Sequence, residues 1–160
     1  MPTPEFILAL RKHVGHDLLW VPGITAVIFD DDGRVLLNRR ADTGEWALIA
    51  GIPDPGEQPA QAAVREAFEE TGVHVEVDRI AAVVAEDPLT YPNGDVVQFL
   101  DITMRCRAVG GRARVNDDES LAVEWFPRDA LPPMAHRMRE RLDLAEKDGP
   151  TWFVPPTADG

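Results

Sequence analysis

Three glutamates lie within five residues in the segment REAFEETG, Arg65 to Gly72. Glu66, Glu69 and Glu70 are spaced i, i+3 and i+4, so a helix would place their carboxylates on one face. Like charges at this spacing cost about 0.2–0.5 kcal/mol per pair, and acids in a last turn also face the negative end of the helix dipole. Hard cations such as Mg²⁺ prefer carboxylate oxygens and often bridge them to phosphates. The spacing therefore favours a metal site, with a solvated acidic face as the alternative.

The residues around these acids have the composition of a helix. Pro59 suits a first turn, the alanines of AQAAVREAFEE favour helix, and Gly72 suits the position just past its end. We expect a helix from about Pro59 to Thr71. Arg65 lies four residues before Glu69 and offsets part of the repulsion, but one cation does not neutralise three acids.

A wider pattern, GIPDPGEQPAQAAVREAFEETGV, resembles the signature of the Nudix hydrolases, G-x5-E-x7-R-E-U-x-E-E-x-G-U, in which U is a bulky aliphatic residue. The matching positions are Gly51, Glu57, Arg65, Glu66, Glu69, Glu70, Gly72 and Val73. Agreement at this many fixed positions is far more specific than a lone glycine motif. Two features depart from the pattern. Ala67 stands where a larger aliphatic residue is usual, and Ile49 and Ala50 replace the start of the usual Pro-Gly-Gly.

The resemblance implies an α/β/α sandwich around a mixed β-sheet, and hydrolysis of a nucleoside diphosphate linked to another moiety with Mg²⁺ or Mn²⁺ as cofactor. The residues that it implies as metal ligands are Glu66, Glu69, Glu70, Glu57 and, through its carbonyl, Gly51. Arg65 would orient the glutamates. The general base differs within the family, so it is either Glu66 or an acid in the loop NDDES, where Glu119 is the candidate. Such chemistry is coherent, since metals neutralise phosphates and lower the pKa of bound water.

Four further side chains are candidates for binding the substrate: Arg39, Arg40, Trp46 and Tyr91. Arginine forks suit phosphate oxygens, and aromatic rings stack on bases, although solvation or packing explains each residue equally well. Pro88 follows Gly72 by sixteen residues, which resembles a feature of the ADP-ribose-cleaving subgroup. ADP-ribose-like compounds are therefore slightly favoured over nucleoside triphosphates, including oxidised ones. A nucleotide-sensing module without catalysis is the third alternative.

The rest of the chain must supply the elements that position these residues. We expect a leading helix over about 4–15, outside a catalytic core of about 23–147, and a Pro-rich tail over about 148–160. GITAVIFDDDGRVLLNRR has the composition of a hairpin with an Asp-Asp-Gly turn, and its DDDG lacks the spacing of a calcium loop. Val96 to Ala108 alternates like a half-buried strand, with Asp101 and Thr103 on the polar face. LAVEWF predicts a strand and MAHRMRERLDLAEK a helix.

Composition limits the classes of function. The chain has 160 residues, 44% of them hydrophobic, which predicts one domain with a single core over 1–160. A formal charge of −12 disfavours long nucleic acid as a partner. No run is apolar enough for a membrane span, the first residues lack a secretion signal, and Cys106 is the only cysteine, so we expect a cytoplasmic protein without disulfides.

Other enzyme classes lack their motifs. Ser120 is the only serine and has no G-x-S-x-G setting, which disfavours a serine hydrolase. The two lysines follow no phosphate-binding glycine loop, and the four histidines have no zinc spacing. The apolar segment LLWVPG after the leading helix needs a neighbour, either the core or a second subunit, so a homodimer is also expected.

Overall fold

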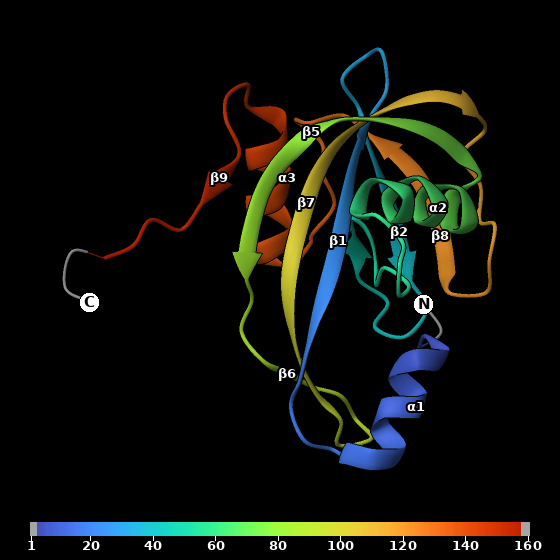
Figure 1. Cartoon of the computed structure of the whole chain (residues 1–160). Helices are drawn as coiled ribbons and strands as arrows, with labels where there is room; N and C mark the ends of the chain where they lie inside the picture. Colours follow the sequence, from blue (N-terminus) through green and yellow to red (C-terminus); the bar gives the residue numbers. More distant parts are fainter. Residues whose placement is uncertain (1–2, 158–160) are drawn as a thin grey trace.

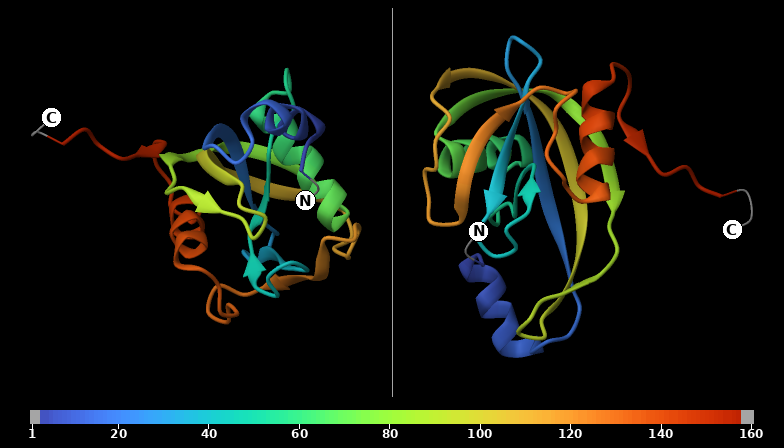
Figure 2. Two further views of the ribbon diagram at one scale, coloured as in Figure 1. Left: turned by 90° about the horizontal axis from the view of Figure 1, so that it is seen from below. Right: turned by 180° about the vertical axis from the view of Figure 1, so that it is seen from behind.

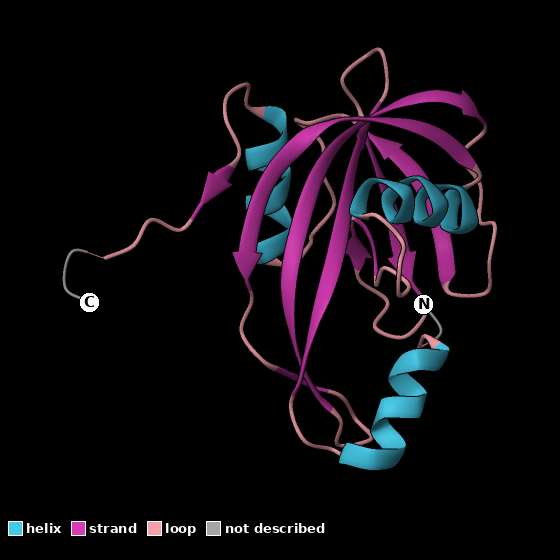
Figure 3. Cartoon of the chain, viewed as in Figure 1, coloured by secondary structure: helices cyan, strands magenta, loops and turns pink. Residues whose placement is uncertain are grey.

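The computed structural model describes residues 3–157, and within that range it contains three helices and one mixed sheet of nine strands (Figures 1 and 3). The elements are α1 (Glu5–Val14), β1 (Leu19–Phe29), β2 (Val35–Arg40), β3 (Trp46–Ala47), β4 (Ile49–Gly51), α2 (Pro59–Thr71), β5 (Val73–Ala85), β6 (Leu89–Thr90), β7 (Val96–Gly111), β8 (Ser120–Phe126), α3 (His136–Glu146) and β9 (Trp152–Phe153). The main strand order is β3-β2-β1-β7-β5-β9, while β4 pairs with β1, β6 with β7 and β8 with β2. The pairs β1–β7 and β5–β9 are parallel and the others are antiparallel.

Two helices cover opposite faces of the sheet: α2 lies in front of it and α3 lies behind it (Figures 1 and 2). Under α2 the core contains three fully buried alanines of the helix, Ala62, Ala63 and Ala67, packed against the sheet. The departure at Ala67 is thus accommodated by close approach of the helix to the strands. Under α3 a second core contains Met138 and Leu142. The expected sandwich of helices around a mixed sheet is confirmed.

The β1–β2 hairpin is confirmed, and its turn is built on Asp30. This carboxylate accepts hydrogen bonds from the backbone N–H of Asp32 at 3.0 Å and of Arg34 at 2.8 Å, as well as from the Arg34 side chain. Phe29 pairs with Val35 at the mouth of the turn. Asp30 therefore closes the turn of the hairpin.

Strand β7 corrects one expectation. Its supposedly solvent-facing residues Asp101 and Thr103 are only 5% and 2% exposed. The alternation is real, but the second face is covered by α3, whose Arg141 lies against Asp101. The prediction of a half-buried strand was wrong because it took polar side chains as a sign of solvent rather than of a polar layer beneath a helix.

The two ends of the chain pack differently. Helix α1 lies beside the ends of β1 and β7, where Ile7 is buried with Val21 and Val97. After α3 the chain adds the short strand β9 to the edge of β5, and from there it extends away from the body (Figure 1). No helix within residues 3–157 combines the length and the apolar character needed to cross a membrane.

Candidate active site

Helix α2 has the predicted bounds, and both its ends are stabilised locally. At the start, the Gln61 side chain accepts a hydrogen bond from the backbone N–H of Gln58 at 3.0 Å. At the end, Gly72 adopts a left-handed φ of 71° and its N–H bonds back to the Phe68 carbonyl. A side chain is strained in this conformation, which explains the glycine just after the acids.

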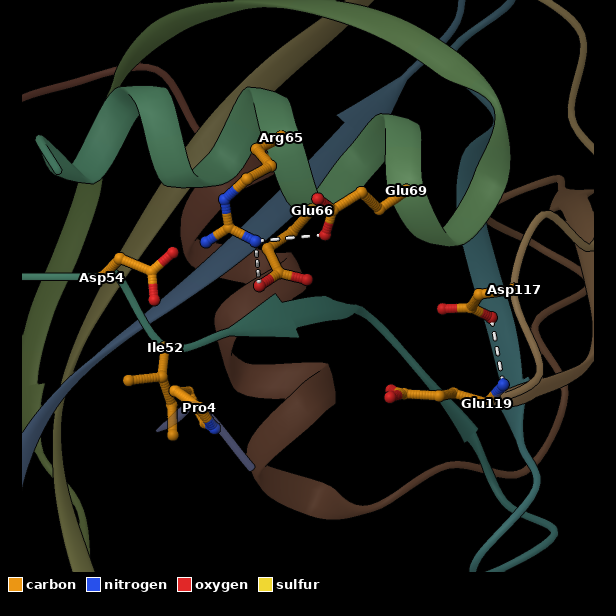
Figure 4. Close-up of a pocket in the computed structure, with 8 residues that line it drawn as sticks. All are labelled: Pro4, Ile52, Asp54, Arg65, Glu66, Glu69, Asp117 and Glu119. Atoms are coloured by element: carbon orange, nitrogen blue, oxygen red, sulfur yellow. Dashed lines mark hydrogen bonds and ion pairs between the residues drawn. The ribbon is translucent and has the colours of Figure 1, made fainter. Parts of the chain in front are cut away.

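Arg65 joins three of the acids of the predicted site, and two of them, Glu66 and Glu69, are drawn beside it in Figure 4. Its Nε and Nη2 donate to the two oxygens of Glu57 at 2.8 and 2.9 Å, a bidentate contact that lowers the pKa of Glu57. Its Nη1 donates to Glu66 at 2.9 Å and to Glu69 at 3.1 Å. Carboxylates from α2 and from the preceding loop thus converge on one cation.

Burial makes two of these acids costly to ionise. Glu66 and Glu70 are 3% and 5% exposed, and desolvation raises the pKa of Glu66 to about 7 and that of Glu70 to about 8. The charge of Glu66 adds to the shift at Glu70. Asn38 supports Glu70 from β2, because its Nδ2 donates to Glu70 Oε2 at 3.1 Å and also contacts Ser120 Oγ at 3.2 Å. Buried carboxylates that repel one another favour the binding of a cation.

Gly51 gives Glu66 its place beside the sheet. It ends β4, where it pairs with Ile24 of β1. A Cβ at Gly51 would lie 2.3 Å from the carboxylate carbon of Glu66 and 2.3 Å from its Oε1. Only glycine therefore lets this carboxylate lie against the backbone of β4. The structure shows this steric role, and ligation by the Gly51 carbonyl stays a prediction.

The loop before β8 is attached to the carboxyl end of α2. Asn116 donates from its side chain to the Phe68 carbonyl at 2.9 Å and from its backbone to the Glu70 carbonyl at 3.3 Å. The N–H of Arg114 bonds to the Thr71 carbonyl at 2.9 Å. The two backbone contacts satisfy the carbonyls of Glu70 and Thr71 in the last turn, where a helix supplies no donors of its own. They also fix the acidic end of the loop relative to the acids of the helix.

A pocket of about 140 Å³ lies between these elements. Its lining residues are Pro4, Ile52, Asp54, Arg65, Glu66, Glu69, Asp117 and Glu119 (Figure 4). Glu119 thus lies at the site as expected, and its N–H donates to Asp117 Oδ1 at 3.1 Å. The pocket brings together acids from three separate segments of the chain.

The chemistry of these donors fits a hard divalent ion. The side chains present carboxylate oxygens, which Mg²⁺ and Mn²⁺ prefer, and Glu66 and Glu69 already share a cationic partner in Arg65. In the part of the chain that the structure describes, no three acidic, histidine or cysteine side chains stand grouped as a ready-made ligand set. A bound ion would therefore compete with Arg65 for the oxygens of Glu66 and Glu69.

The four predicted substrate residues do not gather at the pocket. Arg39 donates to the Gly44 carbonyl, and Trp46 packs edge-on against Phe126 in the core beneath α3. Both residues therefore belong to the face of the sheet that α3 covers, opposite the acids of α2. Arg40 lies nearer the acids, but its fork is bonded to Asp42 at 2.9 and 2.6 Å. Tyr91 is 44% exposed in the turn between β6 and β7. None of them lines the pocket, and their roles stay predictions.

The residues at the site that were missed from the sequence include Asn38, Asn116 and three that line the pocket, Pro4, Ile52 and Asp54. Asn38 breaks the apolar run VLL of β2 at an inward position, which is a readable signal for a buried polar partner. Asn116 begins NDDES, and asparagine commonly bonds to backbone groups near helix ends. Pro4 had no such signal, because its place in the pocket depends on how α1 packs.

Comparison with known proteins matches the chain to one family. The NUDIX domain family model covers residues 19–145. A "MutT-like protein" from Streptomyces ambofaciens is 35% identical over 132 residues, which cover 79% of this chain and 78% of that protein. The human "8-oxo-dGDP phosphatase NUDT18" is 31% identical over 147 residues, 89% of this chain. This chain spans only 42% of the human protein's length.

Solved structures agree with this match. The crystal structure of an ADP-ribose pyrophosphatase from Streptococcus suis superposes with a TM-score of 0.64 at 27% identity, covering 87% of this chain and 99% of that one. A MutT NUDIX hydrolase from Burkholderia pseudomallei gives a TM-score of 0.59 at 29% identity, covering 79% and 98%. Members of the family generally use divalent metal ions. With the family model matched over most of its length, this chain belongs to the Nudix hydrolases.

Proposed function

We propose that this protein hydrolyses the pyrophosphate linkage of a nucleoside diphosphate derivative, with ADP-ribose-like compounds favoured. The observation that carries the proposal is the pair of buried carboxylates, Glu66 and Glu70, in a cluster whose ion pairs within residues 3–157 are formed with Arg65. Such an excess of buried negative charge is costly unless a cation binds with it. A diphosphate brought in with divalent ions supplies that cation.

Glu66, Glu69, Glu70 and Glu57 would hold Mg²⁺ or Mn²⁺, which when bound neutralises phosphate charge and lowers the pKa of bound water. The protein's own part is positioning. Arg65 is bonded to Glu57 on one side and to Glu66 on the other, so it aligns the loop acid with the helix acids. Asn38 orients Glu70 from the sheet. Preorganised groups of this kind lose little reorganisation energy during the reaction.

Glu119 is the proposed general base, with Glu66 as the alternative. The side of the pocket that carries Glu119 also carries Asp117, across from the acids of α2. A base must lie within hydrogen-bond reach of the attacking water, directly or through a second water, and this position faces the proposed diphosphate site. Glu66 is more deeply buried and is bonded to Arg65, which suits a ligand better than a base.

A second candidate activity is hydrolysis of nucleoside di- or triphosphates, including oxidised ones. The support is the 31% identity to the human protein named 8-oxo-dGDP phosphatase. The relative from Streptococcus suis is named for ADP-ribose, so the resemblances support both substrate classes. Both activities would use the same acids, and they differ only in what lies beyond the diphosphate.

The test is product analysis with purified protein, Mg²⁺ or Mn²⁺, and a panel containing ADP-ribose, 8-oxo-dGDP and 8-oxo-dGTP. We expect metal-dependent release of AMP and ribose 5-phosphate from ADP-ribose, and near-complete loss of turnover in Glu69→Gln with the fold retained. Glu76→Gln, an exposed acid on β5, is the matched control. Full activity of Glu69→Gln would refute the role of the acids, and nucleotide binding without hydrolysis would indicate a sensor.

A further inference from the structure

The pocket has two unlike sides. One side carries the acids Asp117 and Glu119, whereas the side nearer the start of the chain carries Pro4 and Ile52, which lie next to each other (Figure 4). Ile52 directly follows β4 and is 9% exposed. Pro4 directly precedes α1. An element outside the acid-bearing segments therefore contributes an apolar surface to the site.

Helix α1 is anchored firmly enough to keep Pro4 in place. The side chain of Arg11 donates to three backbone carbonyls, those of Val96 at 2.6 Å, Gly15 at 3.1 Å and Asp17 at 2.5 Å. On another side of the helix, Ile7 is 7% exposed in an apolar cluster with strands β1 and β7. A single side chain thus joins α1 to the start of β7 and to the turn that follows the helix. Such anchoring suits a fixed wall.

The size of the pocket requires a substrate to extend beyond it. Its 140 Å³ is well below the roughly 300–1,000 Å³ of sites that enclose a whole small molecule. The acids attract the diphosphate and its ions, so the sugars and bases must extend beyond the pocket. Proline and isoleucine side chains offer no hydrogen-bond donors, and a phosphate pressed against them would lose hydration without compensation. The apolar wall therefore suits a non-phosphate part of the substrate.

We propose that Pro4, held by α1 and paired with Ile52, is a specificity-determining residue that limits the size of the sugar or base accepted beside the diphosphate. This inference rests on the proposed function, because it concerns the substrate of the same acidic site. It assigns to the leading helix a role in selecting substrates rather than in the chemistry. The helix was expected to lie outside the catalytic core, and Pro4 is the point where it reaches the site.

The test compares two nucleoside diphosphate compounds that differ in size at both ends, CDP-choline and NADH, so that the orientation of the substrate does not matter. Pro4→Trp narrows the space beside the wall that a sugar or base would occupy. It should lower kcat/KM for NADH relative to CDP-choline roughly tenfold, the scale on which pockets discriminate by shape. Pro4→Ala should shift the ratio the other way. Leu8→Trp is the matched control, since Leu8 is 52% exposed on α1 and does not line the pocket.

A second variant tests whether the helix positions the wall. Arg11→Met removes the anchor without touching the pocket, and it should shift the NADH to CDP-choline ratio in the same direction as Pro4→Ala. Thermal melting of each variant shows that the fold persists. A ratio that stays within twofold of the native value in all Pro4 and Arg11 variants would overturn the inference while leaving hydrolysis itself established.

If the native protein hydrolyses neither compound, the wall is tested by binding instead, while the proposed function is decided separately by the panel of ADP-ribose, 8-oxo-dGDP and 8-oxo-dGTP. Titration calorimetry with Mg²⁺ then gives the ratio of the two dissociation constants in the same variants. The same shifts in that ratio would support the wall, and unchanged ratios or no binding of either compound would overturn it.

Discussion

The sheet carries a buried charged cluster on each face, and the two clusters are balanced differently. Behind the sheet, Arg141 of α3 contacts Glu86 at 2.5 Å and Asp101 at 3.5 Å. The hydroxyls of Thr25 and Thr103 donate to the two oxygens of Asp101 at 2.7 and 2.6 Å. Burial raises the pKa of Asp101, and the charge of Arg141 opposes that shift. In this cluster one arginine pairs with two acids, and two hydroxyls donate hydrogen bonds to one of them, Asp101.

In front of the sheet, Arg65 has ion pairs with Glu57, Glu66 and Glu69, and the buried Glu70 accepts a hydrogen bond from the side-chain amide of Asn38. The difference teaches that a buried acid is not by itself a sign of function. The cluster under α3 closes on itself and ties a helix to the sheet. Among the described residues, the cluster under α2 has more acidic than basic side chains, and under the proposed function this imbalance serves to bind cations.

The largest effect should come from breaking the balanced cluster. Arg141→Met leaves the buried Asp101 and the half-buried Glu86 without their cation, which should lower the free energy of unfolding by about 3–5 kcal/mol. Urea denaturation measures this change. Arg139→Met is the control, since Arg139 is exposed on the same helix and bonds only to the Pro132 carbonyl. Equal stability of the two variants would show that the cluster under α3 does not hold the fold.

The opposite pattern is expected on the other face. Glu70→Gln removes a carboxyl whose ionisation is opposed by burial and by the charge of Glu66, so metal-free protein at pH 7 should unfold at the same or a higher urea concentration. Turnover should fall roughly 10²–10³-fold, about 2.7–4 kcal/mol of activation free energy, as when one preorganised active-site group is lost. Initial rates with saturating Mg²⁺ measure it. A variant that is destabilised yet fully active would place Glu70 with the structural acids instead.

Metal addition separates the clusters directly. Mg²⁺ at about 100 times its dissociation constant should stabilise the native protein by about 2.7 kcal/mol, because only the folded state presents the acids together. Differential scanning calorimetry with and without EDTA measures the shift. The stabilisation should vanish in Glu70→Gln and persist in Asp101→Asn. If Mg²⁺ stabilises neither the native protein nor Asp101→Asn, the excess charge under α2 does not serve a cation.

Local sequence was sufficient to predict the front of the molecule. The bounds of α2 follow from Pro59, the alanines and Gly72, and the helical period alone brings Glu66 and Glu70 to one face. The hairpin of β1 and β2 likewise follows from its turn. Each of these features depends on residues close together in the chain, where propensity and spacing carry the information.

The back of the molecule could not be predicted in this way. The alternating pattern of β7 assigns Asp101 to one face of the strand. Its partner Arg141, however, lies forty residues later on α3, and the local sequence does not indicate how that helix packs. Trp46 appeared suitable for stacking on a base, and only the packing of Phe126 against it shows which face it serves. Pro4 reaches the acids for the same reason. Such contacts arise from the packing of distant elements rather than from local propensity.

The smallest expected effect concerns Asn116, a neutral residue that attaches the loop before β8 to helix α2 on the acidic face of the sheet. Asn116→Ala removes the donor to the Phe68 carbonyl and should cost about 1 kcal/mol of stability, the usual value of one hydrogen bond. Asn93→Ala is matched to it, since Asn93 also makes a side-chain hydrogen bond in a turn, to Asp95 at 3.0 Å. The two variants should therefore differ little in melting temperature.

Their turnover should nevertheless differ. Asn116 fixes the loop that carries Asp117 and Glu119 against α2, so its loss lets the proposed base move relative to the helix acids, whereas Asn93 lies in the separate turn between β6 and β7. We expect kcat to fall several-fold in Asn116→Ala alone, with the stabilisation by Mg²⁺ unchanged because the helix acids keep their places. Equal kcat in both variants would mean that the loop acids take no part in the reaction, and the helix acids would then have to supply the base as well as bind the metal.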